Sequence, residues 1–361
     1  MDIVNPLIVA VGGRRYRKLY VATDDNSTNY SKNPLNEICA QAQWEDEQCD
    51  DEEFLSVRKT ADGYIAYCTD IPSYYFKFIC GRKNESKSRI EKETKTHVSI
   101  PRPGREGDVV ITGPERSGVL SARSRVNLIV ESARGRARPT HFISIPLACA
   151  ATKENFEDFK STVLQDCRDC KGFSEEIIQV PEKLHITMGV MALMSEQEIG
   201  KAAVLLKDLQ DDIQKEFVNG RPLRVVLNGI ECMNDDPSQV VVLYAKVKLD
   251  DGTDRLQRLA DFIVDRFSSA GLMRKEYDKV KLHATVINTN FISAEKETND
   301  IKTDGSQSKT RRKVQFFDAR KLFQICDNFN FGMVDVTSLH LSKRGQYGPD
   351  GFYHSEAQIE I

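Results

Sequence analysis

The sequence predicts an α+β protein with two domains behind an acidic N-terminal segment. Three observations lead to this prediction. The chain has 361 residues, and a domain commonly takes roughly 150 residues. Strand and helix patterns alternate from residue 61 to the C-terminus. The net charge is uneven, being −4 over residues 1–60, +6 over residues 61–138 and −5 over residues 139–361.

Composition excludes several classes of protein. Hydrophobic residues make up 40% of the chain and charged residues 29%, which is typical of a globular protein. The longest apolar stretches, such as Ile143–Ala151 and Val240–Tyr244, are far shorter than the roughly 20 residues that a membrane-spanning helix needs. The N-terminus lacks a secretory signal pattern, and the nine cysteines follow no disulfide framework. We therefore expect reduced thiols and a place in the cytosol or nucleus.

Residues 1–60 are expected to be largely disordered. Seven carboxylates occur among the nine residues Glu45–Glu53, and such a run repels itself and buries little apolar surface. A basic and aromatic stretch, GGRRYRKLY at residues 12–20, precedes this run. We interpret the stretch either as a docking element for a partner or as a basic arm without an ordered role.

Residues 61–138 predict the order strand, helix, helix, strand, strand, helix. Period-two and helical spacing of apolar residues, together with proline and glycine positions, set the elements. The expected strands are Gly63–Cys68, His97–Ile100 and Asp108–Thr112, and the expected helices are Pro72–Phe78, Glu85–Thr96 and Glu115–Ala133. A basic turn lies between the first two helices, and RGRARP at residues 134–139 marks the expected domain boundary.

Residues 139–361 predict a second alternation of strands and helices. A capping-box pattern at Ser195–Glu198 opens one of the helices. The expected strands are Thr140–Ala148, Lys183–Val190, Leu223–Ile230, Val240–Lys248, Lys279–Ile287, Gly332–Ser342 and Phe352–Ile361. The expected helices are Asn155–Leu164, Ser195–Ile213, Asp254–Phe267 and Phe317–Phe329, and Glu295–Lys313 is expected to be a mobile loop.

Two of these strands carry the same motif. The sequence reads KLHITM at residues 183–188 and KLHATV at residues 281–286. Side chains alternate between the faces of a strand, so the His and Thr of each copy share one face while the flanking apolar residues point to the core. We therefore expect His185, Thr187, His283 and Thr285 to form one site. A chance match is the alternative, but a duplicated motif in two strand-like runs argues against it.

Two imidazoles and two hydroxyls suit the cleavage of a phosphodiester without a metal or a cofactor. One neutral His can take a proton from the nucleophile, and one protonated His can give a proton to the leaving oxygen. The Thr hydroxyls can donate hydrogen bonds to phosphate oxygens. The sequence leaves open which His is the base. His340 and Ser342 have the same spacing but are followed by Lys343, so we interpret them as structural or as a substitute for one of the two motifs.

The duplicated motif resembles that of the two-histidine (2H) phosphoesterase superfamily, which carries His-apolar-Thr/Ser-apolar twice. The resemblance covers residues 139–361. It implies a bilobal αβ domain with a central cleft, in which each lobe supplies one motif strand. It also implies metal-independent action on RNA or on a small cyclic or 2′,5′-linked phosphodiester.

Residues 61–138 resemble a K-homology (KH) domain in their βααββα order and in the basic turn between the first two helices. In that family a Gly-x-x-Gly turn lets backbone amides approach the phosphates of single-stranded nucleic acid. The turn here is Gly81-Arg82-Lys83-Asn84, so Asn replaces the second Gly. Asn tolerates a left-handed backbone but adds bulk where a phosphate would lie. Arg82, Lys83, Lys87 and Arg89 would attract the phosphates, unless the fold is kept for protein contacts.

The two domains in this order, with the stretch at residues 12–20, are similar to those of one family of nuclear complex subunits. That resemblance implies a nuclear protein, with the cytoplasm left open, that works beside a large helicase subunit in transcription and alkylation-damage repair. The leading hypothesis is an RNA-binding phosphodiesterase. A non-catalytic RNA-binding adaptor with a ligand-binding 2H cleft and a scaffold that binds no RNA are the alternatives.

Overall fold

The computed structural model describes residues 8–11, 14–17, 57–102, 104–275, 277–292 and 315–361. The chain divides into residues 1–54 and residues 55–361, and each part is described by itself. In the first part, β1 (Ile8–Val11) and β2 (Arg14–Arg17) form an antiparallel pair. These two short strands lie within the segment that was expected to be largely disordered, and the β-branched residues in the sequence of β1 favour extended backbone. The acidic run Glu45–Glu53 lies outside the described residues.

Four antiparallel strands and three helices form the first domain of the second part. The strands follow the order β3-β4-β6-β5 in the sheet. The elements are β3 (Val57–Thr60), β4 (Gly63–Cys68), α3 (Phe76–Cys80), α4 (Glu85–Thr94), β5 (His97–Ser99), β6 (Val109–Gly113) and α5 (Arg116–Arg134). From β4 onward this is the predicted βααββα order. β3 had been assigned to the disordered segment, but it pairs with β4, and Val57 lies in the core.

The core of this domain follows the predicted periodicities. Along α5, five small or β-branched residues face the sheet at helical spacing. They are Val119, Ala122, Val126, Val130 and Ala133. In the strands, buried residues such as Ala66 and Ile111 alternate with more exposed neighbours. One apolar cluster therefore holds the helices against one face of the sheet.

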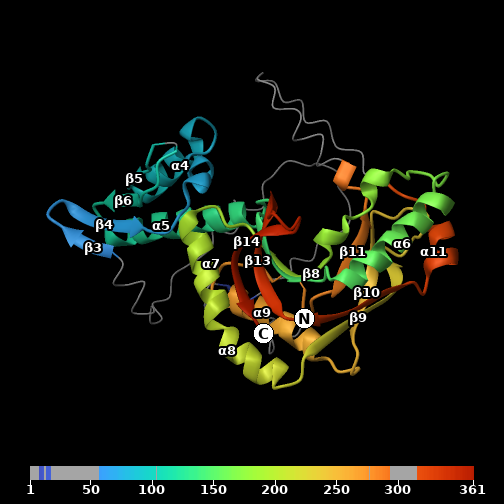
Figure 1. The fold of residues 1–361 in the computed structure, drawn as a ribbon. Helices are drawn as coiled ribbons and strands as arrows, with labels where there is room; N and C mark the ends of the chain where they lie inside the picture. Colours follow the sequence, from blue (N-terminus) through green and yellow to red (C-terminus); the bar gives the residue numbers. More distant parts are fainter. Residues whose placement is uncertain (1–7, 12–13, 18–56, 103, 276, 293–314) are drawn as a thin grey trace. The chain divides into compact units, whose positions relative to one another are not determined.

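An eight-stranded sheet forms the second domain, with the order β12-β9-β10-β11-β8-β7-β13-β14 (Figure 1). All its neighbouring strands run antiparallel. The strands are β7 (His141–Pro146), β8 (His185–Met191), β9 (Leu223–Cys232), β10 (Val242–Leu249), β11 (His283–Asn288), β12 (Asn330–Val336), β13 (Ser338–Tyr347) and β14 (Tyr353–Glu360). Four strands lie on each side of the β11–β8 junction, which gives the sheet two halves.

The helices of this domain cover the two halves. Figure 1 shows α6 beside α11 at the half that ends in β12, and α7 beside β14 at the other. The helices are α6 (Ala150–Asp166), α7 (Glu196–Asp208), α8 (Gln210–Ile213), α9 (Arg255–Ser269) and α11 (Arg320–Cys326). In the described part of the chain, no helix has both the length and the apolar character to cross a membrane.

Two differences from the sequence prediction concern element boundaries around β12, β13 and α6. The expected strand Gly332–Ser342 is two strands, because the chain leaves β12 at one edge of the sheet and enters β13 near the other. Helix α6 starts five residues earlier than Asn155, since Thr152 Oγ1 accepts a hydrogen bond from the backbone N–H of Cys149 at 2.9 Å. The predicted loop Glu295–Lys313 lies outside the described residues.

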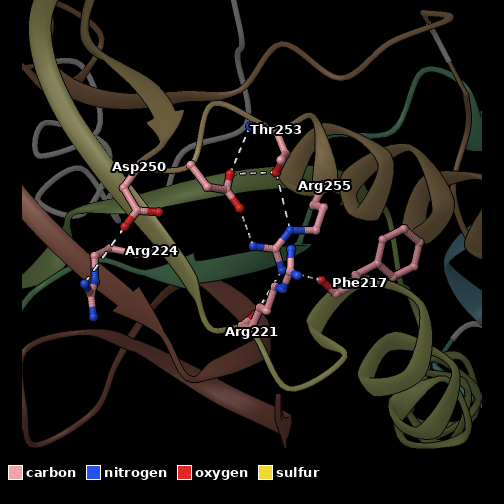
Figure 2. Close-up of polar contacts among 7 residues, drawn as sticks. Phe217, Arg221, Arg224, Asp250, Thr253 and Arg255 are labelled. Carbon is pink, nitrogen blue, oxygen red and sulfur yellow. Dashed lines mark hydrogen bonds and ion pairs between the residues drawn. The ribbon is translucent and has the colours of Figure 1, made fainter.

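A polar network fixes the connection between β10 and α9 (Figure 2). Arg255 near the start of α9 donates hydrogen bonds to the carbonyls of Phe217 and Arg221, each at 2.9 Å, and pairs with Asp251 at 2.7 Å. These bonds join α9 to the segment that enters β9, because Arg221 lies two residues before the start of that strand. The network therefore ties α9 to the chain before β9, outside the motif strands.

Candidate active site and basic turn

The two motif strands are neighbours in the sheet, and Ala284 of β11 lies opposite Ile186 of β8. In an antiparallel ladder this register puts His283 across from Thr187, and Thr285 across from His185. Ile186 and Ala284 are fully buried, whereas the His and Thr side chains are partly exposed. We call the side of the sheet that bears His185, Thr187, His283 and Thr285 the motif face.

Both imidazoles are held in the same way. The Nδ1–H of His185 donates to the carbonyl of Lys183 at 2.7 Å, and the Nδ1–H of His283 donates to the carbonyl of Lys281 at 2.7 Å. A carbonyl oxygen can only accept, so the proton of each neutral ring lies on Nδ1. Each Nε2 is then left as the acceptor, which is the state that a general base needs.

His185 lies among aromatic rings. Its centroid is 5.2 Å from that of Phe142, 5.3 Å from that of Tyr353 and 6.2 Å from that of Phe352. Burial lowers the pKa of His185 to about 4, although its bond to the Lys183 carbonyl acts in the opposite direction. The charge of His283 is a smaller cause that also lowers this pKa. The surroundings therefore favour a neutral His185 at physiological pH.

His283 has more polar neighbours. Its ring centroid is 5.4 Å from that of Tyr244, and Tyr244 bonds to the Glu231 carboxylate, which with burial raises the tyrosine pKa. Burial also lowers the pKa of His283, its bond to the Lys281 carbonyl raises it, and the charge of Lys281 lowers it. The two histidines thus have the same tautomer in different environments.

His340 also belongs to the motif face, but it lies two strands from β8. It stands opposite Ser144 of β7, and Ser144 in turn stands opposite Thr187. Its Nε2 is 2.9 Å from the Ser338 hydroxyl. The structure therefore brings the four predicted residues together and leaves His340 beside them. Sequence reasoning missed the aromatic residues around His185, because they come from β7 and β14, and only an ordered fold brings these strands together.

The basic turn has the backbone that a Gly-x-x-Gly turn requires. Gly81, Lys83 and Asn84 have φ values of 69°, 52° and 64°. The N–H of Asn84 bonds to the carbonyl of Gly81 at 3.4 Å. A Cβ added to Gly81 would lie 2.4 Å from Ser86 Oγ, so this position needs glycine. Asn84 adopts the left-handed conformation that the second glycine would otherwise supply.

The basic residues of the turn differ in their partners. Arg82, Lys83 and Arg89 are exposed and make no ion pair with any residue that the structure describes. Lys87 instead approaches Glu91 at 3.8 Å, one turn along α4. Arg82 and Lys83 are therefore the cations of this turn that an anionic ligand meets first.

Within the described ranges, no three His, Cys, Asp or Glu side chains are grouped so that they could hold a metal ion.

Comparisons with known proteins match both domains. Residues 139–361 match the family model of the AKAP7 2′5′ RNA ligase-like domain, and residues 67–128 match that of the KH domain. The chain is 38% identical over 365 residues to activating signal cointegrator 1 complex subunit 1 of Mus musculus, with 100% of both chains covered. It is 22% identical over 223 residues to an uncharacterized protein of Schizosaccharomyces pombe, covering 61% of this chain and 95% of that one. A solved phosphoesterase structure aligns with a TM-score of 0.36 at 15% identity, covering 62% of this chain and 99% of that one.

Proposed function

The chain belongs to the family of activating signal cointegrator 1 complex subunit 1, with a KH domain followed by a 2H phosphoesterase-like domain, and we propose that it is an RNA-binding, metal-independent phosphodiesterase. One observation carries this proposal. His185 and His283 lie on neighbouring strands, and each is held through Nδ1 so that Nε2 is left for proton transfer. The substrate is single-stranded RNA or a small cyclic or 2′,5′-linked phosphodiester.

In the proposed reaction, His185 is the base and His283 is the acid. The aromatic surroundings of His185 favour its neutral form, so Nε2 takes the proton of the attacking hydroxyl or water. The nucleophile forms the new P–O bond as the old P–O bond breaks. His283, protonated when the anionic substrate binds, gives its proton to the leaving oxygen. Thr187 and Thr285 donate hydrogen bonds to the other phosphate oxygens.

The KH domain is proposed to hold the RNA strand. Gly81 and Asn84 set the backbone of the turn, while Arg82 and Lys83 attract phosphates and Lys87 and Arg89 extend the positive surface along α4. The acidic second domain, with a net charge of −5, would not hold a long polyanion by charge alone. The basic KH domain therefore delivers to the second domain the RNA end that is cut.

We further propose that the protein works in the nucleus, with its cytoplasmic presence left open, as a subunit of a helicase-containing coactivator and alkylation-repair complex. The name of the mouse relative, a subunit of the activating signal cointegrator 1 complex, supports membership of a complex. β2 falls within the basic stretch at residues 12–20, and this stretch would dock on the large helicase subunit. Replacing Arg14 and Arg15 by Asp should abolish co-precipitation of that subunit, and unchanged recovery would contradict this docking site.

Product analysis tests the activity itself. The full-length protein is incubated with 2′,3′-cyclic phosphates, with 2′,5′- and 3′,5′-linked oligonucleotides, and with RNA of different 3′ ends. Cleavage of at least one class supports the proposal. RNA binding without turnover of any of them would instead identify a non-catalytic adaptor.

A further inference from the structure

Lys246 of β10 lies directly opposite His283. The ladder between β10 and β11 pairs Tyr244 with Thr285 and Lys246 with His283. Opposed residues of an antiparallel pair project from the same face, with their Cβ atoms about 5 Å apart. Lys246 therefore belongs to the motif face, on the side of β11 that is away from His185.

The ammonium group of Lys246 lies over a glycine of the next strand. A Cβ added to Gly229 of β9 would be 2.9 Å from Lys246 Cε and 3.2 Å from its Nζ. Gly229 lies in the irregular part of the β9–β10 ladder, between Leu227 opposite Val247 and Ile230 opposite Ala245, which puts it across from Lys246. Glycine leaves space there for the lysine side chain and for the backbone carbonyl of Asp327, which would lie 2.8 Å from an added Cβ. Lys246 forms no ion pair with any residue in the described ranges.

Two other lysines near the histidines already have partners. Lys183 Nζ is 3.8 Å from the ring centroid of Tyr347. Lys281 Nζ is 4.0 Å from Glu231 Oε1 and 5.1 Å from the ring centroid of Tyr244. Of these three lysines, Lys246 is the one without a carboxylate or aromatic partner among the described residues. Its positive charge is therefore the most available to an anionic ligand.

We propose that Lys246 binds a second phosphate of the substrate, next to the phosphate that His185 and His283 cleave. The ammonium group lies over β9, and β9 is two strand spacings, or roughly 10 Å, from β11. At that distance the ammonium group does not contact a phosphate held between β8 and β11. A neighbouring phosphate of the same strand is within reach of the flexible lysine side chain. This inference rests on the proposed function and narrows its substrate to an oligonucleotide, because a 2′,3′-cyclic mononucleotide carries one phosphate.

Binding measurements test this inference without requiring turnover. The probes are the 5′-phosphorylated dinucleotide pApA, with two phosphates, and AMP, with one. Their dissociation constants are measured by calorimetry with the full chain carrying His185→Ala, which prevents cleavage, and with the same chain also carrying Lys246→Gln. Lys207→Gln, an exposed lysine of α7, is the matched control.

We expect Lys246→Gln to weaken pApA binding about tenfold and to change AMP binding less than twofold. Lys207→Gln is expected to change neither affinity. An unchanged pApA affinity, or an equal loss for both probes, would overturn the inference. The proposed function fails separately: a wild-type chain that binds pApA through Lys246 but cleaves no diester supports the phosphate site and contradicts the enzyme.

Discussion

Ala284 of β11 stands opposite Ile186 of β8, and this pair joins the two halves of the eight-stranded sheet. The register across this junction decides which histidine faces which threonine. Both residues are fully buried, so the junction is set by close packing as well as by the ladder. The spacing between His185 and His283 therefore depends on how closely Ile186 and Ala284 pack in the core.

Enlarging Ala284 should impair both catalysis and stability. Ala284→Leu is expected to cost about 1–3 kcal/mol of unfolding free energy by overpacking, and to lower kcat at least tenfold because β11 moves away from β8. Val286→Leu, a buried change two residues along the same strand, is the control. Urea unfolding and kcat are measured for both. Equal losses of kcat in the two variants would show that the junction does not set the spacing.

The pH profile should have an acidic optimum. A base must be deprotonated, so activity is lost as pH falls through the pKa of His185, which is about 4. An acid must be protonated, so activity is lost as pH rises through the pKa of His283, which lies below its ordinary 6.5 in the free protein. The pH dependence of kcat/KM reports the pKa values of the free enzyme. We therefore expect kcat/KM to be highest between the pKa of His185 and the pKa of His283. A maximum of kcat/KM above pH 7.5 would contradict the proposed pair.

The two histidine roles can be separated with an activated leaving group. An aryl phosphodiester that releases 4-nitrophenolate needs little help from an acid. His283→Ala should therefore retain much of its activity on this substrate while losing at least a hundredfold on an oligonucleotide. His185→Ala should lose both activities. The opposite pattern would reverse the assignment and make His283 the base.

The basic turn of the KH domain should govern RNA affinity. Replacing Arg82 and Lys83 by Asp is expected to weaken single-stranded RNA binding at least tenfold and to reduce its salt dependence. Lys59→Gln, which changes an exposed lysine of β3 outside the turn, is the control. Filter binding at several salt concentrations measures both effects. If affinity and salt dependence stay unchanged in the double variant, the RNA lies elsewhere.

Asn84→Gly should tighten RNA binding. Asn84 already has a positive φ of 64°, which glycine adopts freely, so the turn is preserved. The substitution removes the side chain that occupies the place of an approaching phosphate. We expect a lower dissociation constant for single-stranded RNA with a melting temperature within a few degrees of the wild type. Weaker binding with an intact fold would mean that the Asn84 side chain contacts the RNA.

Strand faces and the duplicated motif could be predicted from the sequence because they depend on local periodicity. The burial of Ile186 and Ala284 beside partly exposed histidines follows the expected alternation. The position of Lys246 could not be predicted, because it depends on strand pairing and on an irregularity in the β10–β11 ladder between Leu243 and Tyr244. An added residue of this kind shifts which side chains stand opposite each other.

Other features depend on contacts between distant segments. The ring of Tyr353 lies near His185 because β14 joins the same sheet through β13, and no local pattern indicates this. The break between β12 and β13 leaves only a slight local sign: the buried positions change phase across Thr337 and Ser338, from Val334 and Val336 to Leu339 and Leu341. The turn at Gly81 was accessible to sequence reasoning, since Asn84 was expected to tolerate the left-handed backbone that it adopts.

Cleavage of a panel of 2′,5′- and 3′,5′-linked oligonucleotides by the wild type, His185→Ala, His283→Ala and the double variant tests the acid–base pair most directly. We expect the wild type to cleave at least one linkage at a rate that EDTA does not change. Each single variant should lose at least a hundredfold, and the double variant little more, because the two groups act together. Cleavage that persists in the double variant at the wild-type rate would contradict the assignment of His185 and His283.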